Sequence, residues 1–479
     1  MTRNHSMTRL SDASAPDVFR PTSRGIVHLG LGAFHRAHQA AYTHEASVLT
    51  GDTSWGITGV TQRSNTVAEQ LSPQDGLFTV VEKGDGRASI IGSITEVLSA
   101  AQDSAAVVDA IGDPGVRIVT LTVTEKGYRL DPATGRLRME DPDVASDLDG
   151  SSDGSGPRTV VGQLVAGLAL REKSDSPLTV LCCDNLPHNG SLLAQIVRDY
   201  VDGLDNPSLT AWIENNVAFP STMVDRIVPA TTDADRDRLE AETGLRDDAL
   251  VVCEPFRQWV IEDNFATDRP AWDRVGVQFV ADVEPFETMK LRVLNATHSL
   301  LAYLGSRAGH ATIADAVADP ALDALARRMI TEDIAPTIAP SMNPTAYGDE
   351  VLQRFANPNL PHTTRQVAMD GSQKLGPRLL GTVRDAISGG TSTTWLALAV
   401  ASWIDYVVDA VRNGRDLNDP MADVLADAAS ETDPIAAILG ITQIFGTDLG
   451  ADSRFGTAAR HAARRLQTTP LATLEKELS

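Results

Sequence analysis

Hydrophobic and polar residues follow two different patterns along the chain, and the change falls near residue 285. Before this point, short apolar runs rich in Val, Ile and Leu alternate with stretches in which apolar residues recur every three or four positions. The runs predict strands, the clearest being Gly25–Leu29, Trp55–Val60, Val116–Val123 and Leu178–Cys183. The stretches predict helices, the clearest being Ser104–Ile111 and Val160–Leu170. Strands that alternate with helices indicate βαβ units and a mostly parallel sheet.

After residue 285 the strand pattern largely disappears and helical spacing dominates. We expect helices at Met289–Leu304, Ile313–Ala318, Ala321–Ile334, Thr394–Val411, Met421–Ala429 and Ala458–Leu466. Residues 147–157, rich in Gly, Ser and Asp, predict a flexible loop inside the first half. The sequence therefore predicts an α/β domain over residues 1–285 and a predominantly α-helical domain over residues 286–479.

The charge balance narrows the classes of partner. The chain carries 41 basic and 64 acidic side chains, and 41 − 64 leaves a formal charge of −23. Proteins that bind nucleic acid or anionic membranes need a basic face, so this balance argues against both as partners. It leaves room for one local basic pocket that binds a small anion.

Several features predict a cytoplasmic protein. No apolar run approaches the roughly 20 residues needed to span a bilayer. The N-terminus lacks the apolar core of a secretory signal, whether translation starts at Met1 or at Met7. The three cysteines, Cys182, Cys183 and Cys253, have no zinc-ligand spacing and build no disulfide framework, which fits a reducing compartment. Cys182 and Cys183 should face opposite sides of a strand as packing residues.

The first candidate site is a Gly-x-Gly motif directly after the strand Gly25–Leu29. Gly30 permits a tight turn, and Gly32 lets the backbone approach a pyrophosphate at the N-terminus of the following helix, which Ala33 and Phe34 open. His35 replaces the third glycine of the usual fingerprint. A lone Gly-x-Gly also occurs in structural turns, but its place after an early strand favours dinucleotide binding.

The residues after the second strand bear on the choice of dinucleotide. An acidic residue there favours NAD, and an arginine accommodates the 2′-phosphate of NADP. Residues 61–65 contain no acid and one arginine, Arg63. This segment could equally be a solvated turn, so the preference between NAD and NADP stays open.

The second candidate site opens the helical half. On a regular α-helix, Asn295 lies about 140° around the axis from Lys290, and His298 falls between them at about 80°. The eight residues from Lys290 to His298 span about 12 Å of axis, so Lys290 must use its long side chain to reach a common site. Polar side chains among Leu and Val are costly to bury unless they are hydrogen-bonded or used. The trio is therefore either a satisfied buried network or part of a reaction site.

Hydride transfer to a ketone needs few protein groups, and these residues could supply them. A donor must stabilise the oxygen where negative charge develops, and a general acid must protonate it. A lysine whose pKa is lowered by burial suits the second role, and amides such as Asn295 suit the first. Asn185 is a second amide candidate because its loop follows the strand Leu178–Cys182 at the end where ligands bind, although an Asn-rich turn would read the same. His298 has no partner at a ligand spacing, so we expect no metal.

Taken together, the motifs resemble those of the polyol-specific long-chain dehydrogenases, the mannitol dehydrogenase family. The resemblance covers the chain from about Gly25 to the last helices. The segments that carry it are Gly30–His38, Thr122–Tyr128, Cys183–Gly190, Met223–Pro229, Cys253–Asp263, Lys290–His298 and Asp370–Lys374. It implies a Rossmann-type N-terminal domain, a helical C-terminal domain and an active site in the cleft between them.

The resemblance also implies residue roles. It implies reversible oxidation of a secondary alcohol by NAD or NADP, with NAD slightly favoured and no metal, in an enzyme that can be a monomer. The family's motif places the general acid/base at Lys290 and the oxyanion-stabilising amides at Asn185 and Asn295. His298 holds substrate geometry. Two further residues line the substrate site, Asp225 of the Val-Asp-Arg motif and Lys374.

One departure bears on the substrate. The mannitol-oxidising branch carries an arginine at the position aligned with Gln366, whereas here the arginine is one residue earlier, at Arg365. The segments around Lys126 and Arg257 look more like the fructuronate reductase branch. Arg257 could face a sugar-acid carboxylate, or it could form a structural ion pair with Glu254, Glu262 or Asp263.

These observations rank three functions. The first is interconversion of D-fructuronate and D-mannonate, and the second is the same chemistry on D-mannitol and D-fructose. The third is a dinucleotide-binding sensor without catalysis, which would have no reason to keep Lys290, Asn185, Asn295 and His298 together.

Overall fold

The computed structural model describes residues 8–84, 86–131, 134–150, 156–360, 362–450 and 452–478. The chain divides into two compact units, Met1–Val283 and Glu284–Ser479. The division falls two residues before the boundary expected from the hydrophobic pattern. Each unit is described by itself.

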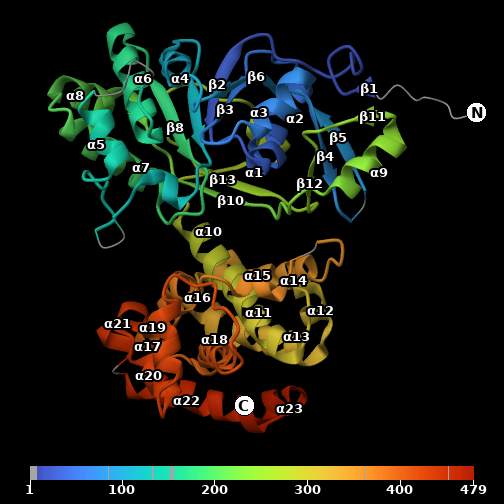
Figure 1. Cartoon of the computed structure of the whole chain (residues 1–479), viewed down its shortest axis with the longest axis vertical. Helices are drawn as coiled ribbons and strands as arrows, with labels where there is room; N and C mark the ends of the chain where they lie inside the picture. The colour runs from blue at the N-terminus through green and yellow to red at the C-terminus, as the bar shows by residue number, and fades with distance from the viewer. Residues whose placement is uncertain are drawn as a thin grey trace, which may run out of the picture. The chain divides into compact units, whose positions relative to one another are not determined.

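The N-terminal unit is built on a six-stranded parallel sheet (Figure 1). Its strands run in the order β6-β3-β2-β7-β8-β9, so the first long strand lies in the middle and the chain winds outward on both sides. This is the strand order of a Rossmann fold, whose ligand site lies where the winding reverses. The strands are β2 (Arg24–Leu29), β3 (Gly56–Thr61), β6 (Ile94–Ser99), β7 (Ile118–Leu121), β8 (Leu178–Cys182) and β9 (Val217–Ala218). The expected Rossmann-type fold is confirmed.

Two hydrophobic cores cover the two faces of this sheet because successive side chains point to opposite sides. On one face, Val27, Leu29 and Cys182 pack with helices α4, α6, α7 and α8. On the other face, Ile26 and Cys183 pack with α2 and with strands of the smaller sheets. The expectation for the two cysteines is therefore confirmed. The helices of this unit are α1 (Ala33–Ala37), α2 (Gln39–Thr50), α3 (Thr66–Leu71), α4 (Ser104–Gly112), α5 (Pro142–Leu148), α6 (Val160–Ser174), α7 (Asn189–Gly203), α8 (Pro207–Asn216) and α9 (Asp233–Thr243).

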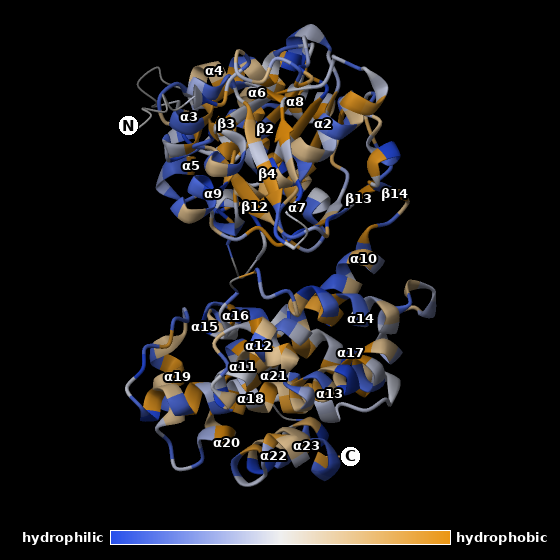
Figure 2. Cartoon of the chain, turned by 90° about the vertical axis from the view of Figure 1, so that its right-hand side faces the viewer, coloured by the Kyte–Doolittle hydropathy of each residue, from blue (hydrophilic) through white to orange (hydrophobic). Residues whose placement is uncertain are grey.

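Smaller sheets extend the unit in ways that the apolar runs did not predict. One has the order β12-β4-β5 and another β10-β13-β14, and the pairs β4/β5 and β10/β13 are antiparallel. Figure 2 shows hydrophobic colour concentrated on strands such as β2 and β4 inside this unit. The strands are β4 (Phe78–Glu82), β5 (Ala88–Ile91), β10 (Thr222–Asp225), β12 (Val251–Cys253), β13 (Gln258–Glu262) and β14 (Gln278–Val280); a two-stranded pair joins β1 (Thr8–Arg9) to β11 (Leu245–Arg246).

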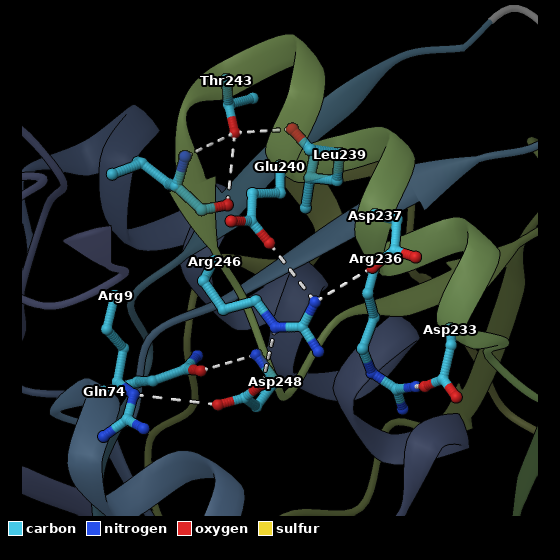
Figure 3. Close-up of polar contacts among 11 residues, drawn as sticks. Arg9, Gln74, Asp233, Arg236, Asp237, Leu239, Glu240, Thr243, Arg246 and Asp248 are labelled. Carbon is cyan, nitrogen blue, oxygen red and sulfur yellow. Dashed lines mark hydrogen bonds and ion pairs between the residues drawn. The ribbon is translucent and has the colours of Figure 1, made fainter. Parts of the chain in front are cut away.

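The acidic helix α9 is fastened to its surroundings by one arginine (Figure 3). The Arg246 Nη1 atom lies 3.2 Å from Asp237 and 3.3 Å from Glu240, and its Nε donates to Asp248 at 3.0 Å. Single exposed ion pairs contribute little, but one guanidinium shared by three carboxylates lowers the repulsion among them. Part of the large negative charge is therefore neutralised locally.

The named elements of the C-terminal unit are all helices. Its longest helix, α18, has the length and apolar composition of a membrane span, contrary to the expectation that no such run exists. In the structure, 72% of that span is buried, and α18 packs against α11 and α22. It is the core helix of this unit. The helices are α10 (Glu284–Met289), α11 (Ala296–Ala308), α12 (Ile313–Ala318), α13 (Pro320–Arg328), α14 (Pro344–Phe355), α15 (Thr364–Ala368), α16 (Gly371–Leu375), α17 (Gly381–Gly389), α18 (Thr394–Arg412), α19 (Ala422–Ala429), α20 (Pro434–Leu439), α21 (Thr442–Leu449), α22 (Ser453–Thr468) and α23 (Leu471–Leu478).

Two expected helices are not regular, and one expected loop is partly helical. The segment 289–304 passes from α10 through a π-helical turn, η4 (Lys290–Asn295), into α11. The segment 321–334 likewise ends in a π-helical turn, η5 (Met329–Ile334). Residues 147 and 148 of the predicted loop belong to α5, while residues 151–155 of that loop lie outside the described residues.

We predict that a buried histidine makes the N-terminal unit sensitive to acid. Burial lowers the pKa of His44 to about 4, below the value of about 6.5 in an unfolded chain. The unfolded state therefore binds the extra proton first, and stability falls as the pH drops from about 6.5 toward 4. His44 accepts a hydrogen bond from the Gly92 amide, which Gln retains in His44→Gln. Between pH 7.5 and 5, urea titrations should show this variant losing about 2 kcal/mol less unfolding free energy than the wild type.

His461→Gln is the control, because His461 is exposed on α22. An identical pH dependence in wild type and His44→Gln would contradict the prediction.

Candidate active site

The turn after β2 brings two strands of the central sheet into close contact. Gly30 has φ +97°, and a Cβ atom there would lie 2.2 Å from the carbonyl oxygen of Thr122. Only glycine fits both this φ and this space. At Gly32, by contrast, a Cβ would meet no atom closer than 3.7 Å, so the space above that backbone is open. The Gly-x-Gly segment thus has the tight turn and the accessible backbone that dinucleotide binding requires.

His35, which replaces the third glycine, has a packing role. Its ring stacks on that of His28 in β2, with centroids 3.4 Å apart and an interplanar angle of 14°. His28 is hydrogen-bonded to Thr120 and Thr122 of β7 and the loop after it. Burial lowers the pKa of His28 to about 3 and that of His35 well below its usual value, so both rings are neutral at pH 7. In the usual fingerprint the third glycine allows the helix to pack closely on the strand. Here the stacked rings of His28 and His35 form that strand–helix contact.

A cavity of about 310 Å³ opens at the carboxyl ends of β2, β3 and β7. Gly30 and the loop that begins at Thr122 line it. The basic residues Arg63, Lys126, Arg129 and Arg158 also line it. Arg63 therefore lines the same cavity as Gly30, and its contact with a cofactor stays a prediction. Ala33 and Phe34 are the first residues of α1 and are partly exposed beside this turn.

Asp184 holds the loop that carries Asn185. Its carboxylate accepts hydrogen bonds from the amides of Val123 and Thr124 at 2.8 and 3.2 Å, and from the Tyr128 hydroxyl at 2.7 Å. Thr124 has φ +67°, a strained conformation for a non-glycine residue, and the bond to Asp184 helps to hold it. Burial raises the pKa of Asp184 although these donors oppose the shift. Asn185 is exposed on the next position, at the end of β8.

Asn189 ties the same loop to the strand that ends in Asp225. Its side-chain amide donates to the Thr222 carbonyl at 2.8 Å and accepts from the Thr222 amide at 2.9 Å. Thr222 starts β10, and Asp225 ends it, 6% exposed. The structure therefore brings the Asn185 loop and the Asp225 strand into one hydrogen-bonded assembly.

Arg257 has a carboxylate partner that the sequence did not predict. Its guanidinium forms a two-pronged ion pair with Glu45 of α2 and lies 4.1 Å above the Tyr42 ring. The expected structural partners were Glu254, Glu262 and Asp263; the ion pair in the structure is with Glu45 instead. The contacts of Arg257 therefore support a structural ion pair and not the binding of a substrate carboxylate.

In the C-terminal unit, the π-helical turn η4 changes the predicted geometry of the lysine and the asparagine. In a π-helix, residue i bonds to residue i+5, so Asn295 lies about one turn above Lys290 on nearly the same face. The offset of about 140° expected for an α-helix is therefore wrong. His298 follows in α11, about 60° around the axis from Asn295. Lys290 is 8% exposed. The trio shares a narrower arc than the sequence predicted.

His298 lies in a cationic and aromatic environment. Its ring stacks on Phe355 at 4.6 Å and on His362 at 5.6 Å. Burial first, and then His362 and the positive charges of Arg378, Lys374 and Arg354, lower the pKa of His298 well below its usual value. It is therefore a neutral ring at pH 7. Its buried Nε2 atom has no hydrogen-bond partner among the described residues.

The remaining predicted residues lie on and near α15 and α16. The Lys374 Nζ atom donates to the carbonyls of Met369 at 2.5 Å and Val367 at 3.4 Å. Gln366 closes a capping box with Thr363 at the start of α15. Arg365 is exposed and lines a cavity of about 320 Å³ with residues of α18. Among the described residues, no group of three or more His, Cys, Asp or Glu side chains could hold a metal ion.

Sequence reasoning missed two residues of this site. Asp184 lies inside a quoted motif, and a carboxylate directly after a buried strand is a signal that could have identified it. Arg378 follows Lys374 by four residues, a spacing that places two side chains on one helix face. It donates to the Ser299 hydroxyl at 3.1 Å, beside His298.

Comparisons with known proteins assign both units of the chain to one family. Residues 24–274 match the mannitol dehydrogenase Rossmann domain, and residues 282–467 match the mannitol dehydrogenase C-terminal domain. D-mannonate oxidoreductase of Escherichia coli (strain K12) is 43% identical over 96% of this chain and 98% of the relative. The structure of Pseudomonas fluorescens mannitol 2-dehydrogenase with NAD and D-mannitol superposes with a TM-score of 0.82 at 36% identity, covering 99% and 97% of the two chains. A substrate-free D-sorbitol dehydrogenase gives 0.85 at 32% identity, covering 98% and 97%.

We predict that Asp184 holds the cofactor loop in shape. Asp184→Ala leaves two amides and one hydroxyl without their acceptor, which should lower the unfolding free energy by about 3 kcal/mol. The loop 122–128 lines the cavity, so KM for the dinucleotide should rise at least ~10-fold. Asp184→Asn keeps a side chain of the same shape with one acceptor oxygen, so its unfolding free energy and its KM should lie between those of the wild type and those of Asp184→Ala. Urea titration and steady-state kinetics measure both effects. An Ala variant with wild-type stability and KM would show that the loop holds its shape without this carboxylate.

Proposed function

Because this chain belongs to the mannitol dehydrogenase family of oxidoreductases, we propose that it interconverts D-fructuronate and D-mannonate with NAD or NADP. The observation that carries this proposal is the 43% identity to a D-mannonate oxidoreductase over nearly the full length of both chains.

The proposed chemistry needs no metal. A bound nicotinamide supplies the hydride in one direction and accepts it in the other. Gly30 and Gly32 fit this group, because the backbone at Gly32 is open to a pyrophosphate. Asn185 and Asn295 donate hydrogen bonds to the oxygen on which negative charge develops.

Lys290 is the proposed general acid/base. In the reducing direction its Nζ atom delivers a proton to the alkoxide oxygen, and in the oxidising direction it takes that proton back. The π-helical turn supports this pairing, since it places Lys290 and Asn295 on one face. The neutral His298 ring can hold a substrate hydroxyl, and Asp225 and Lys374 are proposed to line the substrate site.

A guanidinium in the C-terminal unit supports an anionic substrate. Arg378 lies in a π-helical turn, η8 (Gly376–Leu380), that packs against η4. Ser299, its hydrogen-bond partner, follows Asn295 by four residues on the same helix face. Arg378 is half-buried, and burial lowers its pKa, yet it forms no ion pair with a described carboxylate. A charge withdrawn from water is costly unless it is paired. The carboxylate of a sugar acid would provide that pair. Arg257, already paired with Glu45, is the weaker candidate for this role.

The second candidate function is the interconversion of D-mannitol and D-fructose. It is favoured by the similarity to Pseudomonas fluorescens mannitol 2-dehydrogenase, whose structure holds NAD and D-mannitol. Arg365 lies one residue from the position of the arginine in that branch.

We further propose a cytoplasmic, monomeric enzyme. The three cysteines are free and buried, which suits a reducing compartment. Among the described residues, the exposed large apolar side chains are Val48, Leu49, Leu204 and Val424, too few and too scattered for a large apolar interface.

The role of Lys290 predicts a specific kinetic defect. Lys290→Ala should lower kcat at least ~100-fold, because proton transfer by a positioned side chain contributes that much. Added methylamine should restore part of the rate, since it can carry the same proton. Lys173→Ala, which removes a lysine at the far end of α6, is the control. An unchanged kcat across the pH range would rule out Lys290 as the general acid/base.

The role of Arg378 predicts a change of specificity. Arg378→Met keeps the length of the side chain and removes the charge. It should lower kcat/KM for fructuronate about 100-fold and that for fructose less than 3-fold. Arg384→Met is the control. Arg384 lies on α17 and is paired with Asp448, so its loss should leave kcat/KM for both substrates unchanged. An equal loss on both substrates would mean that Arg378 supports the structure, and a wild-type preference for fructose would favour the second function.

A further inference from the structure

Basic side chains gather around the cavity in the N-terminal unit. Arg63, Lys126, Arg129 and Arg158 line it, and no carboxylate is among its described lining residues. Arg63 follows β3, Lys126 lies in the loop after β7, and Arg158 directly precedes the cap of α6. Four positive charges from three segments of the chain thus meet at one cavity.

Three of these four charges are not neutralised by a described side chain. Arg129 is paired with Asp141 and Asp143 at 3.0 and 2.5 Å. Arg63, Lys126 and Arg158 form no ion pair with any described residue. The whole chain carries 23 more acidic than basic side chains. Because carboxylates are in excess, basic side chains that lack a carboxylate partner are unusual in this protein. Like charges around one cavity repel one another, and an anion bound among them would remove that repulsion.

Helix α6 adds a positive potential of its own. Thr159 and Val160, at its N-terminus, line the same cavity. The helix has 15 residues, and its Thr159 cap accepts a hydrogen bond from the Gly162 amide. The N-terminal end of a helix favours a nearby negative charge.

The position of Arg63 identifies which part of a dinucleotide would lie there. In a Rossmann fold the end of the second strand, here β3, lies beside the adenosine ribose. Two hydrogen bonds hold this loop. The Asn65 side chain accepts one from the Ser99 hydroxyl at 2.5 Å, and the Gln62 side chain donates one to Gln163 at 3.2 Å. An acid that would bind a free 2′-hydroxyl is absent from residues 61–65, and an arginine is present.

We propose that Arg63, with Lys126 and Arg158, binds the 2′-phosphate of NADP, and that this chain prefers NADP(H) to NAD(H). The inference rests on the proposed function only for the class of cofactor. The pyrophosphate is proposed to lie at the Gly30–Gly32 turn, whose Gly30 lines the same cavity, and the 2′-phosphate among the cations at the end of β3, in the loop after β7 and before α6. A guanidinium suits a phosphate because it offers two parallel N–H donors.

Ligand binding by the full chain tests this without any turnover. Isothermal titration calorimetry should show 2′,5′-ADP binding at least ~10-fold more tightly than 5′-AMP. Arg63→Ala should weaken 2′,5′-ADP about 30-fold and 5′-AMP less than 3-fold, while Arg63→Lys should recover part of the loss. Lys126→Ala and Arg158→Ala should each cause a smaller loss. Arg198→Ala, on α7, is the control and should change neither. Steady-state kcat/KM should favour NADPH over NADH, and Arg63→Ala should reverse the order.

The outcomes separate this inference from the proposed function. Equal binding of 2′,5′-ADP and 5′-AMP by the wild type would overturn it. A second result would also overturn it: Arg63→Ala weakening the binding of ADP, which carries only the 5′-diphosphate, as much as the binding of 2′,5′-ADP. The cations would then bind the pyrophosphate. Strong, Arg63-dependent binding of 2′,5′-ADP without turnover of sugar acids or polyols would support the inference and overturn the proposed function alone.

Discussion

The close contact between the Gly30 backbone and the Thr122 carbonyl is the constraint on which the N-terminal site depends. It holds the end of β2 against the start of the loop after β7, where a side chain of any size would force the two apart. That loop then reaches Asp184, whose carboxylate accepts from two of its amides and from Tyr128. Asn185 and, through Asn189, the strand of Asp225 are positioned by the same loop. One turn without a side chain thus holds the end of β2 close to the loop that Asp184 binds.

The C-terminal half of the site depends on backbone winding instead of on a glycine. A regular α-helix would carry Lys290 and Asn295 away from each other around its axis. The π-helical turn brings them together, and a second one at η8 carries Arg378 to the face of Asn295 and Ser299. Wider turns are rare because their hydrogen bonds are poorer, and they persist where function or packing demands them. The main chain therefore places the lysine and the amide on one helix face and packs the turn that carries Arg378 against them.

Local patterns predicted the parts of the fold that local forces determine. The strands β2, β3, β7 and β8 lie within two residues of their predicted bounds, because their apolar runs are buried on both faces of a parallel sheet. The helix α12 has the predicted bounds, with a Thr312 cap and an apolar face. The antiparallel pairs β4/β5 and β10/β13 were missed, since their strands are short and only partly apolar. The π-helical turn η4 was missed because residues 290–295 contain neither Gly nor Pro, so no local signal in the sequence marks its winding. Arg257 and Glu45, 212 positions apart, could not be paired without the fold.

The π-helical turn also has a consequence for how this chain tolerates changes of length. A π-turn holds one residue more than an α-turn between the same hydrogen-bonded ends, so it is equivalent to an insertion absorbed within a helix. Removing one residue from 291–294 would restore regular α-helical winding and leave the lysine and its amide four residues apart, still on one face of the helix. At this place the chain could therefore lose one residue and keep the two side chains on the same face, whereas the same deletion within regular α-helix would rotate everything that follows by about 100°.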